Sequence, residues 1–377
     1  MYAVDLPAPI LITQPTALRK LVDELVQEPV VAVDTESNSL YAYQEQVCLI
    51  QFSTAQEDFL VDPLALADLS PLSALFSSSE IEKVFHAAEY DLLTLKRDFG
   101  YTFTNLFDTM LAARILGWKE IGLGPILRDK FGIRLNKRYQ RANWGRRPLP
   151  PDMLDYARLD TRFLIPLRDR LQSELKERDR WALAMEDFDR LRHVNGRDPA
   201  DLPEACWKVS GSHDLTPQRA AVLQELCLYR DWVAKEMDRP LFKVMHDRSL
   251  LAIAEATPQS LKDLRRLPGM SNKQVRRHGQ ALLNAVQRGL RAEPKYPPSS
   301  PRPEDGYLDR VDALRYWRKK MARKMGVNSD VILPRDLLYS IASRNPRTER
   351  DLQAILQQVP WRKQRFGDQI LEVLDGV

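Results

Sequence analysis

Short apolar runs alternate with segments of helical periodicity through the first half of the chain, and this alternation constrains the fold more than any other feature. The apolar runs, which are rich in β-branched residues, occupy residues 10–13, 30–34, 47–53, 58–62 and 83–86. Helical periodicity occupies residues 15–27, 64–76, 89–98, 108–117 and 152–179. Strands interleaved with helices predict an α/β layered domain. Residues 43–62 predict a hairpin, so we expect a mixed sheet flanked by helices.

The strand pattern stops after residue 194, and the rest of the chain is helical apart from two loop-like segments. Residues 195–204 are typical of a loop, and the Pro/Ser-rich residues 294–303 are typical of an extended linker. The two helical blocks repeat one another at an offset of 88, since WVAKEM at position 232 matches KMARKM at position 320. We therefore expect an α/β domain at 1–194 and two related all-α domains at 211–292 and 304–377.

The charge of the chain is unevenly distributed. The net charge is +4, but residues 211–377 hold 30 Lys and Arg against 20 Asp and Glu, whereas residues 1–210 are acidic overall. A basic half suits a polyanionic partner such as a nucleic acid. A solvated basic surface accounts for the same charge equally well.

Cysteine usage and hydropathy bear on the compartment. Cys48, Cys206 and Cys227 are scattered and form no C-x-x-C pair, which argues against a disulfide framework or a zinc site and suits a reducing cytoplasm. No apolar run reaches the roughly 18 residues that a membrane span requires, and the first residues lack the pattern of a secretory signal. We expect a cytoplasmic protein that contacts no membrane and uses no organic cofactor.

Two acidic residues follow the apolar residues 30–33. Side chains at positions i and i+2 of a strand lie on one face, so Asp34 and Glu36 converge if the strand continues to residue 36. Like charges at this separation raise each other's pKa unless a cation lies between them. A hard divalent cation is the usual partner of such oxygen ligands. The alternative is a strand end whose two acids face water.

Two further segments carry an acid in a helix. His86 ends the short run 83–86, and Asp91 follows in the first turns of the next helix. Tyr156 and Asp160 are four residues apart and lie on one helix face, where the tyrosine can hold a water against a metal bound by the acid. Plainer interpretations exist: helix N-termini favour carboxylates such as Asp91, and Tyr156 suits the core side of an amphipathic helix.

Taken together, the order D-x-E, H-x-x-x-x-D and Y-x-x-x-D resembles the DEDD superfamily of 3′→5′ exonucleases, in the branch with tyrosine in the third motif. The resemblance implies a ribonuclease-H-like fold and two metal ions, Mg²⁺ or Mn²⁺, held by four acids. On this sequence those acids are Asp34, Glu36, Asp91 and Asp160, and Tyr156 positions the attacking water. Two metals suit phosphodiester hydrolysis because they stabilise both the attacking and the leaving oxygens.

The segment between the second and third motifs is strongly basic. Residues 128–150 hold eight Arg and Lys but one Asp, with aromatic residues among them; this suits phosphate contacts and base stacking, or else a solvated loop. In the DEDD family a matching stretch carries a basic residue, a Gln and then D-W-x-x-R-P-L, in which Asn143 here replaces the acid. The residues that we expect to bind substrate are His86, Lys137, Gln140, Trp144 and Arg147.

The helical repeat carries a second resemblance. Residues 215–290 resemble an HRDC domain, a small helical module that binds nucleic acids or proteins, and residues 307–375 resemble a diverged second copy. In the first copy, Lys273, Arg276 and Arg277 follow a Pro-Gly turn, where they either contact phosphate or form a solvated basic face. An exonuclease domain followed by two HRDC-like domains is the arrangement of the bacterial ribonuclease D family.

This resemblance implies a metal-dependent 3′→5′ exoribonuclease whose partner is RNA. It would trim the 3′ ends of structured RNA such as tRNA precursors and release nucleoside 5′-monophosphates. A DNA 3′→5′ exonuclease of the repair type is one alternative, although this sequence contains no helicase or polymerase segment. The other is a catalytically silent RNA-binding scaffold, which is expected to have lost an acid, whereas all four are present.

Overall fold

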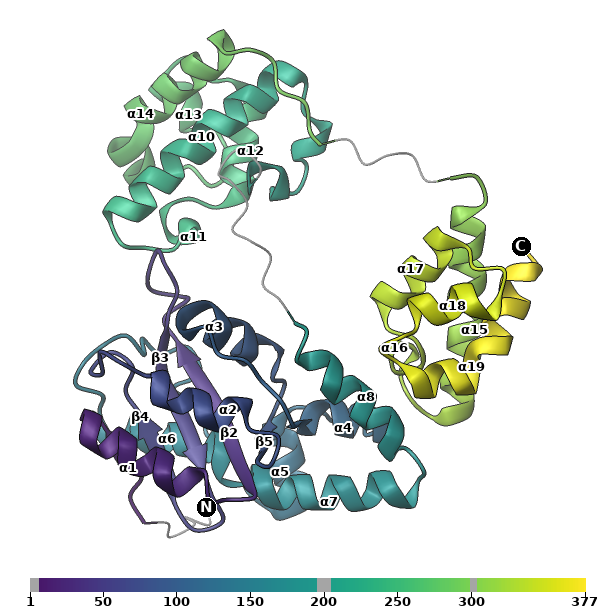
Figure 1. Ribbon diagram of the computed structural model, residues 1–377. Coiled ribbons are helices and arrows are strands. Elements are labelled where there is room, and N and C mark those ends of the chain that lie inside the picture. The colour runs from purple at the N-terminus through teal and green to yellow at the C-terminus, as the bar shows by residue number, and fades with distance from the viewer. Residues whose placement is uncertain (1–6, 195–204, 299–303) are drawn as a thin grey trace. The chain divides into compact units, whose positions relative to one another are not determined.

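The computed structural model describes residues 7–194, 205–298 and 304–377, which belong to two compact units. The first unit contains an α/β domain and the C-terminal helices. The second contains residues 38–46, which leave the α/β domain between two strands, and the first helical block (Figure 1). No helix among the described residues is long and apolar enough to cross a membrane.

A six-stranded mixed sheet forms the centre of the α/β domain. In spatial order its strands are β1 (Ile10–Ile12), β4 (Asp58–Val61), β3 (Val47–Ser53), β2 (Val30–Ser37), β5 (Glu82–Phe85) and β6 (Leu106–Asp108). The pairs β2–β3 and β3–β4 are antiparallel, and the other three are parallel. The hairpin and the mixed sheet that the sequence predicts are therefore confirmed.

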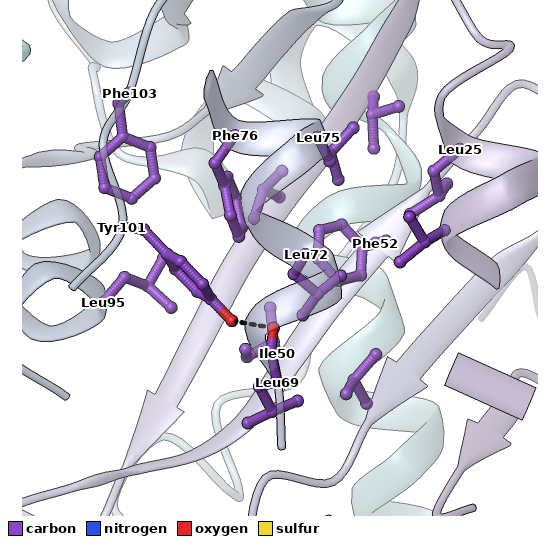
Figure 2. Packing of buried hydrophobic residues seen from close by; sticks show 14 of the residues in the cluster. Leu25, Ile50, Phe52, Leu69, Leu72, Leu75, Phe76, Leu95, Tyr101 and Phe103 are labelled. Carbon is purple, nitrogen blue, oxygen red and sulfur yellow. Dashed lines mark hydrogen bonds between the residues drawn. The ribbon is translucent and has the colours of Figure 1, made fainter. Parts of the chain in front are cut away.

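Helices cover both faces of this sheet, because alternate residues of β2 belong to different apolar clusters. Val31 and Val33 pack with α1 (Pro15–Leu25), α2 (Ser73–Ser77) and α3 (Glu89–Phe99). Ala32 packs instead with α4 (Thr109–Leu116), α7 (Leu164–Glu177) and α8 (Trp181–Leu191). Figure 2 shows part of the first cluster, in which the Tyr101 hydroxyl donates a 2.7 Å hydrogen bond to the Leu69 carbonyl. The buried hydroxyl thus keeps a partner.

The elements predicted for the α/β domain differ from the observed ones in two helices, and three further elements were not predicted. The expected helix over 64–76 is reduced to a 3₁₀ turn, η1 (Ser70–Leu72), followed by the short α2. The expected helix over 152–179 is divided into α6 (Pro151–Arg162) and α7, because Pro166 lacks an N–H and its ring clashes with the carbonyl four residues earlier. The strand β6 and the helices α5 (Leu123–Phe131) and α8 were not expected.

The two helical blocks have the same order of helices, as the repeat predicts. In the first block they are α10 (Pro217–Glu236), α11 (Leu241–Val244), α12 (Asp247–Ala256), α13 (Leu261–Leu264) and α14 (Asn272–Arg291). In the second they are α15 (Tyr307–Met325), α16 (Ser329–Ile332), α17 (Arg335–Arg344), α18 (Glu349–Ile355) and α19 (Pro360–Asp375). Thr257 and Asn345, 88 residues apart, end α12 and α17 in the same left-handed conformation, with φ of 43° and 45°.

Within the first unit, the second helical block contacts α8 through a buried ion pair. Arg362 at the start of α19 is fully buried, and its Nη1 lies 3.0 Å from Glu186 Oε2 and 2.9 Å from Asp187 Oδ1. Its remaining donors bond the carbonyls of Val331 and Ile332. Buried charges cost free energy unless they are paired and hydrogen-bonded, and this guanidinium has both kinds of partner.

Candidate active site

Three elements bring the predicted acids together. The strand β2 continues to Ser37, so Asp34 and Glu36 lie on one face, as the i, i+2 rule requires. Asp91 lies in the first turn of α3, and Asp160 lies in α6. Each of Asp91, Asp160 and Glu36 is close enough to Asp34 to raise its pKa by charge repulsion. The structure thus gathers four carboxylates that are up to 126 positions apart (34 against 160) in the sequence.

The four carboxyl groups have raised pKa values, and burial is the largest cause in each case. The pKa values of Asp34 and Glu36 lie well above their usual range, with further increases from the neighbouring acids. Burial raises the pKa of Asp91 and of Asp160 to about 7. Desolvated like charges cannot all ionise without positive charge between them. Four ionised carboxylates are therefore unfavourable at this site without bound cations, and bound cations would stabilise them.

The residues present fit hard divalent cations in their donor chemistry. Among the residues that the structure describes, no group of three or more His, Cys, Asp and Glu side chains is placed, as it stands, so that it could hold a metal ion. Four carboxylates nevertheless offer the oxygen ligands that Mg²⁺ and Mn²⁺ favour. Gln51 adds a second observation: it is fully buried, lies opposite Asp34 in the β2–β3 register, and neither polar atom of its amide has a hydrogen-bond partner.

Asp108 fixes the turn that leads into α3. Its carboxylate, which is 1% exposed, accepts hydrogen bonds from the backbone N–H groups of Ala87 (3.2 Å) and Ala88 (2.7 Å) and from those of Met110 and Leu111. Ala87 has a φ of 64°, a conformation that is uncommon for a residue with a side chain. Asp108 therefore caps α4 and also holds the chain just before Asp91. The sequence analysis missed this residue, although an Asp directly before a helical segment is an N-cap signal.

Asp91 and His86 are each tied to a threonine. The Thr35 hydroxyl donates to Asp91 Oδ1 at 2.5 Å and moderates the rise in the pKa of that carboxyl. His86 Nδ1 lies 2.8 Å from Thr109 Oγ1, and burial lowers the pKa of the imidazole from 6.5. The ring is therefore neutral at physiological pH and serves as a hydrogen-bonding group rather than a cation.

Tyr156 lies one helical turn before Asp160 and remains protonated. Burial, followed by the charges of Asp160, Glu36 and Asp34, raises the pKa of its phenol. Its ring lies against Tyr139 and Trp144, with centroid separations of 5.8 and 6.1 Å. A held, neutral phenol beside carboxylates can orient a water by hydrogen bonding.

The expected substrate-binding residues separate into two groups. His86, Lys137 and Gln140 line one cavity of about 310 Å³ together with Asp34, Tyr156 and Asp160. Trp144, by contrast, is 1% exposed and packs against Leu49, Leu60 and Met153. The expectation that its ring stacks on a base does not fit this burial, because the ring is part of the core. The first group thus keeps its predicted place at the acids.

Arg147, which was expected to bind substrate, bonds groups of the α/β domain instead. Its Nε and Nη2 both bond Asp62 at 2.6 Å, and Nη1 and Nη2 bond the carbonyls of Trp144 and Cys48 at 2.7 Å. A guanidinium engaged by a bidentate carboxylate has few donors left for phosphate. Arg147 therefore holds the 128–150 segment against the sheet. A basic residue in the sequence pattern does not by itself reveal whether it has this structural role or binds substrate.

Comparisons with known proteins agree with this geometry. Residues 9–176 match the family model described as 3′-5′ exonuclease, and residues 219–286 and 308–374 match the HRDC domain model. The α/β domain is therefore a 3′–5′ exonuclease domain and is followed by two HRDC domains. Ribonuclease D of Nitrobacter hamburgensis is 31% identical over 97% of this chain and 95% of its own length. This chain belongs to the ribonuclease D family.

Three further similarities extend the comparison. The exosome complex exonuclease RRP6 of Saccharomyces cerevisiae is 30% identical over 85% of this chain, which spans 46% of that protein. The crystal structure of Escherichia coli RNase D has the same fold, with a TM-score of 0.72 over 98% of this chain at 24% identity. The catalytic core of RRP6 from Trypanosoma brucei is 32% identical, with a TM-score of 0.66 over 77% of this chain and 81% of that one.

Membership in this family confirms the predicted enzyme class. The chain is a hydrolase, a 3′–5′ exoribonuclease, and enzymes of the DEDD exonuclease family use divalent metal ions. The fold class predicted from the sequence is confirmed as well.

Proposed function

We propose that this exoribonuclease trims the 3′ ends of structured RNA, in particular tRNA precursors, and releases nucleoside 5′-monophosphates. The choice of tRNA precursors follows from the resemblance to bacterial ribonuclease D in motif order and in the two HRDC domains. The observation that carries the site assignment is the cavity in which Asp34, Tyr156 and Asp160 meet His86, Lys137 and Gln140. A cavity lined by both carboxylates and hydrogen-bond donors suits a phosphodiester with its metal ions.

Two divalent ions, Mg²⁺ or Mn²⁺, are proposed to be held by Asp34, Glu36, Asp91 and Asp160. When bound, such ions stabilise the charge on the attacking and leaving oxygens of a phosphodiester. The chain itself contributes the other parts of the reaction. Tyr156 keeps its proton and orients the attacking water, since burial and the adjacent acids raise the pKa of the phenol.

Lys137, Gln140 and His86, which line the same cavity, position the substrate. Lys137 offers a positive charge to the terminal phosphate, and Gln140 and the neutral His86 offer hydrogen bonds to the last nucleotide. Phosphate contacts of this kind fix register without reading sequence. We propose domain limits of 1–194, 211–292 and 304–377, and a cytoplasmic location, which suits three buried cysteines that form no disulfide.

The test is the shortening of a 5′-labelled tRNA with a 3′ extension by the purified chain with Mg²⁺ or Mn²⁺, followed on sequencing gels. Asp160→Asn should lower the rate by at least about a hundredfold, since it removes a charge from a site that depends on charge. Asp152→Asn is the matched control, because Asp152 lies on the same helix with its side chain 71% exposed. Loss of a negative charge there should leave the rate unchanged.

Two outcomes would replace the proposal. Shortening of single-stranded DNA with an intact tRNA would favour a DNA exonuclease. Inactivity on both substrates with retained RNA binding would favour an RNA-binding scaffold. Full activity of Asp160→Asn would remove that residue from the site.

A further inference from the structure

The two HRDC domains provide an internal comparison of equivalent positions. The helices α11 and α16, and likewise α12 and α17, begin and end 88 residues apart (241 against 329, 247 against 335). One side chain keeps its contact at the same offset. Arg230 Nη1 donates to the Met245 carbonyl at 3.1 Å, and Arg318 Nη1 donates to the Leu333 carbonyl at 2.9 Å. In both copies, an arginine of the long first helix thus bonds the backbone just before the third helix.

The charge at this corner differs between the copies. In the first copy, Arg230 Nη1 pairs with Asp247 Oδ1 at 2.5 Å, and the neutral thiol side chain of Cys227 lines the same cavity. In the second copy, the residue equivalent to Asp247 is Arg335, and the residue equivalent to Cys227 is Arg315. The first copy therefore has one arginine paired with a carboxylate at this position, whereas the second copy has three arginines.

These three arginines line one small cavity with a tyrosine. Arg315, Arg318, Arg335, Leu338 and Tyr339 enclose about 330 Å³. Arg315 Nη2 donates to the Tyr339 hydroxyl at 2.8 Å, and the guanidinium of Arg335 lies 5.3 Å from the centre of the Tyr339 ring. Both contacts fix the direction of the guanidinium groups.

Carboxylates do little to balance this charge. Asp312, whose side chain is 76% exposed, lies 3.3 Å from Arg315 Nη1. Asp336, next to Arg335, pairs instead with Arg190 of α8 at 2.8 Å. Arg318 Nε is buried and has no hydrogen-bond partner, and the same is true of Arg230 Nε in the first copy, so the copies differ in their charge balance and not in this donor. Three clustered arginines with little compensating carboxylate charge suit an anion.

We propose that this pocket of the second HRDC domain binds a phosphate group of the RNA backbone. Guanidinium groups match phosphate oxygens in charge and in the geometry of paired hydrogen bonds. Lys319 and Arg323 follow Arg315 at one-turn intervals along α15 and are exposed. A row of cations leading away from the pocket suits a chain of phosphates rather than a single free anion. The assignment rests on the proposed function, since it takes the substrate RNA as the ligand.

The test compares Arg335→Asp with Arg350→Asp in the full chain. Arg335→Asp gives the second copy the carboxylate that the first copy has beside Arg230, so the variant is expected to fold and to melt no lower than the parent protein. Arg350 is exposed on α18 of the same domain and makes none of the ion pairs found among the described residues. The two variants change the net charge equally.

Binding is measured by fluorescence anisotropy with a 3′-extended tRNA in EDTA, so that metal-dependent cleavage cannot consume the probe. Arg335→Asp should weaken binding about tenfold and reduce the slope of log K against log salt by about one, as expected for a lost phosphate contact. Arg350→Asp should change the affinity by less than about twofold. If Arg335→Asp fails to fold, Arg315→Gln on the exposed side of α15 makes the same comparison against Arg350→Gln.

Two results would overturn the proposal, and a third tests the function on which it rests. Equal RNA affinities for the pocket variant and its control would overturn it. Inorganic phosphate that binds the parent protein calorimetrically but not Arg335→Asp, with no change in RNA affinity, would make the pocket a free-anion site and overturn the assignment to RNA. The parent protein and Arg335→Asp should both hydrolyse a dinucleotide. Loss of this hydrolysis in both proteins would count against the proposed function and not against this pocket.

Discussion

Gln51 lies directly opposite Asp34 across the β2–β3 pair, buried and without a hydrogen-bond partner for either polar atom of its amide. A buried amide without hydrogen-bond partners destabilises the folded protein. Such an amide is therefore expected where a bound ligand provides the missing hydrogen bonds. Its neighbour is a carboxyl group that is proposed to hold a metal ion. We therefore expect that the Gln51 amide lowers the stability of the metal-free protein and contributes to the metal-bound site.

Gln51→Leu tests that link, because it replaces the amide by an apolar side chain of similar size. Without metal the variant should melt higher, by an amount that corresponds to about 1 kcal/mol. The rise in melting temperature produced by Mn²⁺ should become smaller, since the amide no longer helps the metal-loaded site. Ser249→Ala is the control: its hydroxyl is also buried and unpartnered, but it lies in the first HRDC domain. Destabilisation of metal-free Gln51→Leu would contradict the argument.

The pH dependence of stability follows from the acids. The folded-state pKa values of Asp91 and Asp160 are raised to about 7, above the value near 3.8 expected in the unfolded chain. The folded state therefore binds more protons than the unfolded state between about pH 4 and pH 7, and the stability of the metal-free protein falls as pH rises through that window. Urea unfolding in EDTA should show a loss of several kcal/mol between pH 5 and pH 8.

Two variants separate the site from the rest of the protein in that experiment. Asp160→Asn should flatten the pH dependence, while Asp155→Asn, with a side chain that is 57% exposed on the same helix, should preserve it. The affinity for Mn²⁺ should change with pH in the opposite sense and rise through pH 7, because metal binding requires ionised carboxylates. Stability that increases from pH 5 to pH 8 in EDTA would show that the acids are not buried together.

Asp108 is a positioning residue, and Asp108→Ala should reveal this in turnover as well as in stability. Four backbone N–H groups lose their acceptor, which should cost about 2 kcal/mol or more. Because the turn before α3 shifts, kcat on a dinucleotide should fall at least about tenfold while KM changes little. Asp68→Ala is the control, since Asp68 accepts from the Ser70 N–H in the distant η1 turn. Equal kcat values for the two variants would leave Asp108 with a structural role alone.

Much of the α/β domain could be predicted from periodicity because β2, β3 and β4 are continuous apolar runs. The order of the acid motifs then led to Asp34, Glu36, Asp91, Tyr156 and Asp160, since the resemblance is carried by spacing along the chain. What escaped prediction depends on contacts distant in sequence. Trp144 and Arg147 look like a nucleic-acid motif, but only the fold reveals the Asp62 carboxylate 85 positions away that engages the arginine.

Arg147→Lys tests this structural interpretation against Lys137→Gln. A lysine cannot reproduce the bidentate contact with Asp62 or the bonds to three backbone carbonyls, so Arg147→Lys should lower the free energy of unfolding by about 2–4 kcal/mol and leave KM nearly unchanged. Lys137→Gln should do the reverse and raise KM about three- to tenfold without a change in stability. A raised KM with unchanged stability in Arg147→Lys would return Arg147 to the substrate site.

Arg362→Ala should destabilise the contact between the second HRDC domain and α8. Its guanidinium is fully buried, and its removal leaves Glu186, which is 6% exposed, without its charged partner. Breaking a buried pair from one side costs about 3–5 kcal/mol. The double variant Arg362→Met with Glu186→Gln should recover part of that loss, because the more deeply buried of the two carboxylates no longer carries an unpaired charge. Urea unfolding monitored by Trp361 and Trp181 fluorescence, with the exposed Arg365→Ala as control, measures both effects. If Arg362→Ala is as stable as the control, the buried pair does not hold this contact together.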